Sequence, residues 1–277
     1  MLATLCWIPG QIEEAVGYAD AGQTVINGNG DPVSFGVEGA LAAVYLVIGQ
    51  PERGVEWCRA QLARGRDTHT LTRFCLVQAL TAAGAGDEAR AAANGLIDAA
   101  EATHNPFVLS YALWAYGFAF RDADPVRALE ASRRGLVIAQ DSGNRIVESQ
   151  LANALSPLEA KHGDPLAALD HITLAIRDFY ESGHVAYIPS ALATLAVFLD
   201  RLGRLEPAAT IAGFAFNPLT ATVPDFNTAI AHLREVLGEA TYESLARKGE
   251  TMTTAAMVTY AYDQIDQARA ALNTVAK

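Results

Sequence analysis

The stretch 161–171, KHGDPLAALDH, gathers in one short segment several residue types that could carry chemistry. Two histidines and two aspartates could bind a metal ion or move protons: His162, Asp164, Asp170 and His171. A zinc site, however, needs three or four converging ligands held in place by further hydrogen bonds. The Gly-Asp-Pro order also indicates a turn between two helices, since Asp caps a helix and Pro suits its first position. We favour the turn, with the histidines on solvated helix surfaces.

Two other segments imitate a cofactor loop or an anion site. Gly84–Ala89, GAGDEA, has the spacing of a dinucleotide-binding loop, but that loop follows a strand, and helices are expected on both sides here. Asn27–Pro32 is rich in Gly and Asn, which is typical of an ordinary connection. Cys58 and Cys75 fall where helices are expected to pack, so we expect them to be small, buried apolar side chains. We expect no catalytic residue, no cofactor and no metal site, and an enzyme is the least expected class.

Composition narrows the class of protein further. The 277 residues are 51% hydrophobic and carry a formal net charge of −11, which argues for a folded core and against binding to a nucleic-acid backbone. No stretch approaches the roughly 20 apolar residues that span a bilayer, and the N-terminus lacks the basic start of a signal peptide. The three cysteines form no CxxC pair and indicate reduced thiols. We therefore expect a cytoplasmic protein without membrane contact.

Breaks between helices recur with a regular period, and this repeat is the strongest pattern in the chain. Ala, Leu, Glu, Arg and Gln dominate, so nearly all of the chain is expected to be helical. Successive turns are spaced by 39, 37, 37, 40 and 40 residues, and begin at Gly10, Gly49, Gly86, Ala123, Gly163 and Gly203. Such a period predicts an all-α, tetratricopeptide-like superhelix, that is, an α-α solenoid of stacked helix pairs.

Small residues and helix caps follow the same register. Five positions after each turn begins, the residue is small, as close packing of paired helices requires: Ala15, Gly54, Ala91, Ala128, Ala168 and Ala208. Glycine is expected to end the first helix of a pair in the left-handed conformation. Asp87, Asp124 and Asp164 are expected to cap the second helix, with Pro125 and Pro165 at its first position.

Towards the end of the chain, the motif Ala208-Ala209-x-x-x-Gly213 precedes a helix ending in Leu237-Gly238. A short helix ending at Gly249 and a last amphipathic helix from Thr253 follow. This order resembles the C-terminal end of bacterial regulators that join an ATPase module to degenerate tetratricopeptide repeats. They include LuxR-type transcription regulators and mycobacterial-type proteins with an N-terminal class III adenylate cyclase domain. The chain departs from that family at 216–225, FNPLTATVPD, where relatives have a longer connection.

The resemblance implies repeats over 1–215, about six with the first one truncated, and a C-terminal helical cap over 216–277, all packed as one continuous domain. The chain has no GxxxxGK[ST] phosphate loop, so any ATPase or cyclase activity would belong to an absent N-terminal part. Only about nine residues precede the turn at Gly10, which leaves Trp7 and Ile8 for upstream sequence or a partner to cover. A homodimer through this truncated end is one possibility.

Carrying the tetratricopeptide pattern onto this register gives a concave groove lined by the first helix of each pair. Its positions are mostly apolar with a few hydrogen-bonding groups and one cation, which suits a helix or an extended peptide: Arg73, Leu76, Ser110, Leu113, Phe120, Gln150 and Asn153. The same residues could instead pack against a neighbouring domain.

The last helix, Thr253 to Leu272, is expected to cap the repeats with one apolar face, although a dimerisation helix is the alternative. Its apolar positions recur at helical spacing: Ala255, Ala256, Val258, Tyr262, Ile265, Ala268 and Leu272.

The function expected from the sequence is that of a non-catalytic scaffold for protein–protein or interdomain contacts. The resemblance implies the sensing or regulatory arm of a signalling ATPase, whose partner is a protein, a peptide or the parent's own ATPase module. A stand-alone dimeric adaptor and a sensor domain that binds a small molecule are the alternatives.

Overall fold

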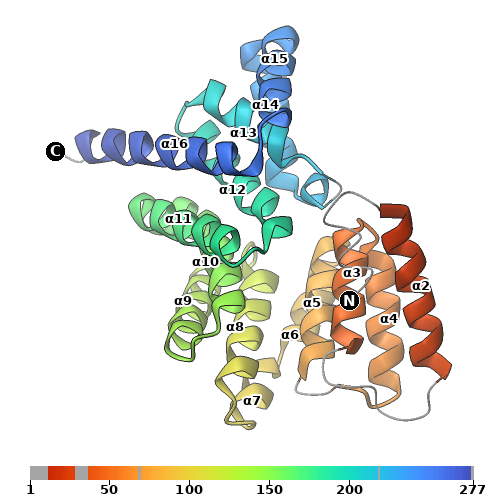
Figure 1. Cartoon of the computed structure of the whole chain (residues 1–277). Helices are drawn as coiled ribbons and strands as arrows, with labels where there is room; N and C mark the ends of the chain where they lie inside the picture. The colour runs from red at the N-terminus through yellow and green to blue at the C-terminus, as the bar shows by residue number, and fades with distance from the viewer. Residues whose placement is uncertain (1–11, 29–36, 68–69, 218, 276–277) are drawn as a thin grey trace. The chain divides into compact units, whose positions relative to one another are not determined.

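Helix-forming residues dominate this chain, and the computed structural model is helical throughout the parts it describes (Figure 1). These parts are residues 12–28, 37–67, 70–217 and 219–275, and none of them contains a strand. The prediction of an all-α protein is therefore confirmed. The predicted first turn at Gly10, with Trp7, Ile8 and Cys6, lies outside the described residues.

The chain divides into two compact units, Met1–Val147 and Glu148–Lys277. The predicted boundary between repeats and cap, at residue 215, lies inside the second unit, so it does not separate the two. Whether the helix pairs build one superhelix stays a prediction.

The first unit consists of helices that pack on their neighbours in sequence, with α5 in contact with α3, α4, α6 and α8. Its elements are α2 (Ile12–Gly28), α3 (Val37–Val47), α4 (Pro51–Ala63), α5 (Leu71–Ala82), α6 (Gly86–Ala93), α7 (Leu96–Glu101), α8 (Pro106–Phe120) and α9 (Pro125–Asp141). The second helix of the third pair is split into α6 and α7, because Gly95 adopts the left-handed conformation at φ +72°.

The second unit begins within α10 (Arg145–His162) and ends with three helices that pack on α11, α12 and α13. Its other elements are α11 (Pro165–Glu181), the 3₁₀ turn η2 (Val185–Tyr187), α12 (Ile188–Arg201), α13 (Leu205–Ala215), η3 (Thr220–Thr222), α14 (Pro224–Leu237), α15 (Glu239–Glu250) and α16 (Thr254–Val275).

Small residues stand where helices approach closely, as their spacing predicts. A Cβ atom at Gly54 of α4 would lie 3.4 Å from the Cβ of Ala79 and 3.5 Å from the carbonyl oxygen of Ala42, so one position touches both flanking helices. Ala128, Ala168 and Ala208, at the equivalent position of later pairs, are completely buried. The side chain of Ala15 is outside the described residues.

At the third turn, the register predicted from the sequence is wrong. Gly84, at φ +76°, is the left-handed residue after α5, whereas Gly86 already begins α6. Asp87 therefore lies inside the first turn, where it pairs with Arg90 instead of capping the helix. The predicted tight position, Ala91, is exposed, and the buried residue is Ala89, five positions after Gly84.

The other two predicted caps are confirmed. Asp124 accepts a hydrogen bond from the backbone N–H of Arg127, and α9 begins at Pro125. Asp164 accepts one from the N–H of Leu166 at 2.8 Å, and α11 begins at Pro165. Each cap satisfies a backbone donor that the first turn of a helix leaves open.

Helices α13 and α15 cross with their backbones in direct contact. A Cβ atom at Gly213 would lie 2.1 Å from the carbonyl oxygen of Ala246, and one at Gly249 would lie 1.9 Å from that of Thr210. Both glycines belong to the motifs noted near the end of the chain. The helix crossing explains why these positions are glycine, because no residue with a side chain fits there.

The corner at 216–225 is a tight turn in which buried polar groups are hydrogen-bonded. The side-chain oxygen of Asn217 accepts from the N–H groups of Leu219 and Thr220, at 2.9 and 3.0 Å. The Thr220 hydroxyl in turn donates to the carbonyl of Ala215 at 2.8 Å. This corner ends α13 and leads directly into α14.

The last helix is the predicted one, with a shifted apolar face. Val258, Ile265 and Ala268 are buried as expected, whereas Ala255 and Ala256 are exposed. The remaining buried positions are Met257, Ala261 and Gln264. Since α11, α12 and α13 all contact α16, its buried face is set by several neighbours at once.

No described helix combines the length and apolarity needed to cross a bilayer.

Candidate functional site

The segment 161–171 is a turn, built around a carboxylate that precedes it. Glu159, in the last turn of α10, is 1% exposed, and its carboxylate accepts a hydrogen bond from the N–H of Asp164 at 3.2 Å. A Cβ atom at Gly163 would lie 2.0 Å from this carboxylate, so the glycine makes room for it. The glycine of this turn therefore serves close packing, and its φ is not in the left-handed region.

The histidines and aspartates of the segment do not converge. His171 lies with its Nε2 atom 3.9 Å from the Glu159 carboxylate, and its side chain is 20% exposed. Asp170 turns to solvent and pairs with Arg269 of α16 at 2.8 Å. His162 is exposed at the end of α10. The predicted turn is confirmed, but Glu159 was missed, because it lies two residues before the segment that drew attention.

Within the described part of the chain, no three His, Cys, Asp or Glu side chains come together in a group that could hold a metal ion. Gly84 and Ala85 lie between α5 and α6, and Gly86–Ala89 belong to α6, so helices flank this segment as the repeat predicts. Of the predicted loop Asn27–Pro32, Asn27 and Gly28 end α2 instead, and the remainder lies outside the described residues.

Cys58 and Cys75 are buried between helices, as predicted. They are 0% and 5% exposed. Burial raises the pKa of the Cys75 thiol to about 12 and also raises the pKa of the Cys58 thiol far above its ordinary value. Both are therefore protonated at neutral pH, and a protonated thiol is a poor nucleophile.

The residues predicted to line a groove have very different surroundings. Leu76, Ser110 and Leu113 are buried. Arg73 is half-buried and pairs with Asp67 at 2.8 Å. Five of the seven positions belong to the first unit, and Gln150 and Asn153 belong to the second.

Phe120 and Asn153 are partly exposed and engaged with neighbours. The Phe120 ring stacks on Tyr116, with the ring centres 4.3 Å apart. The Asn153 amide of α10 donates to Ser190 at 3.1 Å and accepts from Thr194 at 3.2 Å, which ties α10 to α12. Gln150 is partly exposed, one turn before Asn153 on the same helix.

A row of aromatic side chains runs along the partly exposed face of α8. It consists of Phe107, Tyr111, Trp114 and Phe118, whose spacing of four, three and four residues places them on one face of the helix. Phe74 of α5 packs against this aromatic row. Its ring centre lies 4.7 Å from that of Tyr111 and 5.0 Å from that of Trp114.

The partly exposed residues of α8 thus follow the predicted groove positions Ser110 and Leu113 by one residue in the sequence. The reason is that α8, PFVLSYALWAYGFAF, contains no charged residue, so its sequence carries no polar face by which to set the phase. The signal that could have found the row was the periodic spacing of its aromatic residues.

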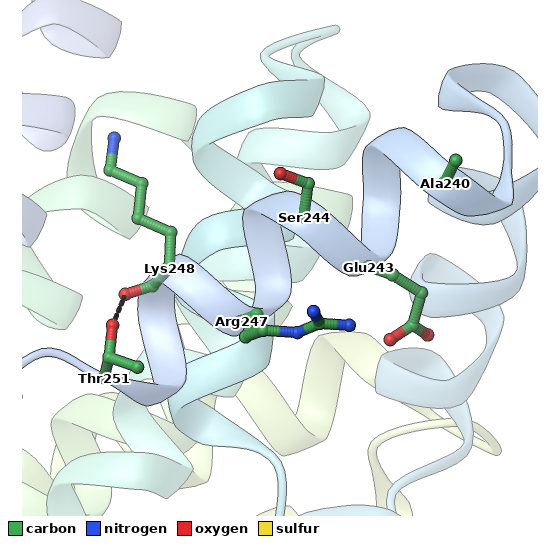
Figure 2. A pocket seen from close by; sticks show the side chains of 6 residues that line it. All are labelled: Ala240, Glu243, Ser244, Arg247, Lys248 and Thr251. Atoms are coloured by element: carbon green, nitrogen blue, oxygen red, sulfur yellow. Dashed lines mark hydrogen bonds between the residues drawn. The ribbon is translucent and has the colours of Figure 1, made fainter.

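A shallow hollow lies along α15, lined by Ala240, Glu243, Ser244, Arg247, Lys248 and Thr251 (Figure 2). Figure 2 shows the side chains of Arg247 and Lys248 pointing in different directions, so the two cations do not converge on a common anion. Glu243 is held by Arg234 at 2.6 Å. The hollow therefore has the features of an ordinary charged helix surface.

The sequence matches no protein-family model, and the comparison with curated proteins likewise gives no match. The function therefore has to be argued from the residues themselves.

Proposed function

We propose that the chain is a non-catalytic helical-repeat scaffold that binds a protein or peptide partner, with the aromatic row of α8 as the centre of the contact. The observation that carries the proposal is the row itself. All four members are partly exposed, and Phe107, Tyr111 and Trp114 contact Phe74 or one another, so their rings are already fixed in position.

Such a surface suits recognition of a polypeptide. Trp and Tyr are the residue types that most often dominate the energy of protein interfaces, because they bury much area and lose little conformational freedom. The adjoining helix α5 also carries Arg73, next to Phe74 in the sequence, whose guanidinium pairs with Asp67 of the preceding connection at 2.8 Å.

The sequence resemblance supports a more specific role, in which the partner is the ATPase module of a signalling regulator. In that role, the helix pairs stack into a tetratricopeptide-like superhelix, and partner binding to it biases the switch of the ATPase.

The test is a calorimetric titration of the chain with the ATPase module of such a regulator. We expect a stoichiometric complex, and we expect Trp114→Ala to weaken it by roughly tenfold or more, since loss of a central aromatic residue costs about 2 kcal/mol or more. Val126→Ala, on the exposed side of α9, is the matched control and should leave the affinity unchanged.

Two results would contradict the proposal. One is the absence of binding at high micromolar concentration. The other is equal loss of affinity in the Trp114 and Val126 variants. A defined dimer in light scattering, together with no ATPase binding, would favour the stand-alone adaptor instead.

A further inference from the structure

The two described cysteines belong to neighbouring helices of the first unit. Cys58 lies on α4 and Cys75 on α5, and the two helices are in contact. Only residues 64–70 connect them, and helices joined by so short a connection run antiparallel.

The register of this helix pair places the two thiols opposite each other. A Cβ atom at Gly54 of α4 would lie 3.4 Å from that of Ala79 of α5, which fixes one matched pair of positions. Residues four apart on a helix share a face. One turn forward from Gly54 is Cys58, and one turn back from Ala79 is Cys75, so these two form the next matched pair.

The following layer agrees with this register. Gln61 lies seven residues after Gly54, and Thr72 lies seven residues before Ala79. Both are buried, at 0% and 2% exposed, although both are polar. Cys58 and Cys75 therefore occupy the middle layer of a continuous helix–helix contact. Burial and, to a smaller extent, the charge of the Cys75 thiolate raise the pKa of Cys58, in agreement with this register.

The separation suits a covalent bond. A disulfide spans Cβ atoms about 3.5–4.5 Å apart, and in the neighbouring layer a Cβ atom added at Gly54 would lie 3.4 Å from that of Ala79. Since α4 and α5 are in such close contact one turn away, the cysteine layer requires little movement to reach that range.

We propose that Cys58 and Cys75 are a redox-sensitive thiol pair, which a small-molecule disulfide converts into an intramolecular disulfide between α4 and α5. One cysteine thiolate attacks the small disulfide, releases one small thiolate and forms a mixed disulfide. The second cysteine thiolate then attacks the protein sulfur of that mixed disulfide and releases the second small thiolate. Two protein thiols lose two electrons, one small disulfide gains them, and the two thiol protons pass to the released thiolates.

Burial controls the rate of this reaction. The attacking species is the thiolate, and both thiols are held protonated and away from solvent. Oxidation therefore proceeds through transient opening of the α4–α5 contact, and the product then holds that contact closed. Cys75 adjoins Phe74, which supports the aromatic row, so the disulfide would also fix the helix beneath it. The thiol pair itself does not depend on the proposed binding function.

The experiment equilibrates the full chain carrying Cys6→Ala with mixtures of reduced and oxidised glutathione. The fraction of chain that has lost two hydrogens is read by mass spectrometry after acid quenching, and peptide mapping identifies the Cys58–Cys75 link. The same titration in concentrated urea gives the equilibrium constant of the unfolded chain. We expect the folded chain to form the disulfide more readily, with an equilibrium constant on the order of 100-fold larger, as a fold that holds the two thiols together requires.

The Cys75→Ala variant in the same background is the matched control, and it should give only the mixed disulfide with glutathione. An equilibrium constant that is larger in the folded chain than in urea supports the proposal. A constant that is equal or smaller overturns it, because the fold would then fail to favour the bond. A folded chain that accumulates only mixed disulfides also overturns it.

Discussion

At the scale of single residues, the features that matter most are groups hidden from solvent. Glu159, Cys58 and Cys75 are all buried, although each carries an ionisable group. The protein deals with them in two ways. The carboxylate receives a backbone N–H, whereas the thiols are kept in their neutral form.

The Gly163→Ala substitution tests the room made for Glu159. The added methyl group would meet the carboxylate 2.0 Å away, so the carboxylate must leave its hydrogen bond with Asp164. We expect a loss of about 1–3 kcal/mol in the free energy of unfolding, measured in urea. Gly17→Ala in α2 is the control, since a Cβ atom there has nothing within 4 Å and should not destabilise the protein.

A double variant makes this test specific. In a Glu159→Ala background the carboxylate is absent, so Gly163→Ala should cost clearly less than in the wild type. If the cost is the same in both backgrounds, the contact with Glu159 is not its cause.

The buried thiols predict a fall in stability at alkaline pH. Because the pKa of Cys75 rises to about 12 in the folded protein, from an ordinary value of 9.0, the unfolded chain loses its proton first as the pH increases. The contribution of this thiol to stability is complete below pH 9 and is lost as the pH rises towards 12. Urea unfolding at several pH values should show this fall, and Cys75→Ala should make it shallower. An unchanged slope in the variant would argue against the raised pKa.

At the scale of helices, some helices pack through direct contact of their main-chain atoms, where side chains usually form the contact. The α13–α15 crossing depends on Gly213 and Gly249, whereas a Cβ atom at Gly54 of α4 would make only ordinary contacts, the nearest at 3.4 Å. Gly213 and Gly249 bring α13 and α15 closer than any larger residue permits.

Gly213→Ala is expected to destabilise the second unit strongly. The new methyl group would lie 2.1 Å from the Ala246 carbonyl oxygen, and a main-chain group cannot rotate away as a side chain does. We expect a loss of about 3 kcal/mol, at the upper end of the range for overpacking. Thermal unfolding followed by circular dichroism provides the measurement. Gly22→Ala in α2, whose Cβ atom would lie 4.0 Å from Leu41, is the control, and equal effects in the two variants would refute the argument.

The sequence predicts these elements well where turn chemistry is unambiguous. Asp124-Pro125 and Asp164-Pro165 place a cap and a first helical residue together, and both helices begin there. The third turn offers two glycines, Gly84 and Gly86, and the sequence alone does not decide which one adopts the left-handed conformation. The choice of the second glycine misplaced both Asp87 and Ala91.

The candidate surface was less predictable, for a related reason. Amphipathic helices reveal their buried face through polar residues on the opposite face, and α8 has no charged residue at all. Its register could be set only by neighbours such as Phe74, which belong to another helix. The role of Glu159 was missed because this residue lies just before the segment 161–171, although Gly163 follows it at the helical spacing of four residues. Its approach to His171 arises only after the chain has turned.

At the scale of the whole molecule, the division into 1–147 and 148–277 separates the spectroscopic reporters. All three tryptophans of the sequence lie before residue 148, and the two described ones, Trp57 and Trp114, belong to the first unit. Tryptophan fluorescence should therefore follow unfolding of the first unit, whereas circular dichroism follows both.

This division gives a prediction for the Gly213→Ala variant, whose substitution lies in the second unit. We expect the circular dichroism transition to move to lower urea concentration while the fluorescence transition stays close to that of the wild type. Transitions that shift together by the same amount would show that the two units unfold as a single cooperative body.

The crossing of α13 and α15 also limits how the protein can change by mutation. A neighbour that is a side chain can be exchanged for a smaller one, so most tight contacts can be restored by a second substitution. At Gly213 and Gly249 the neighbours are main-chain atoms of Ala246 and Thr210, which every amino acid possesses. No second-site change can relieve a clash with them except by moving a whole helix. A saturation library over the second unit should therefore return many solutions for its apolar core and only glycine at these two positions.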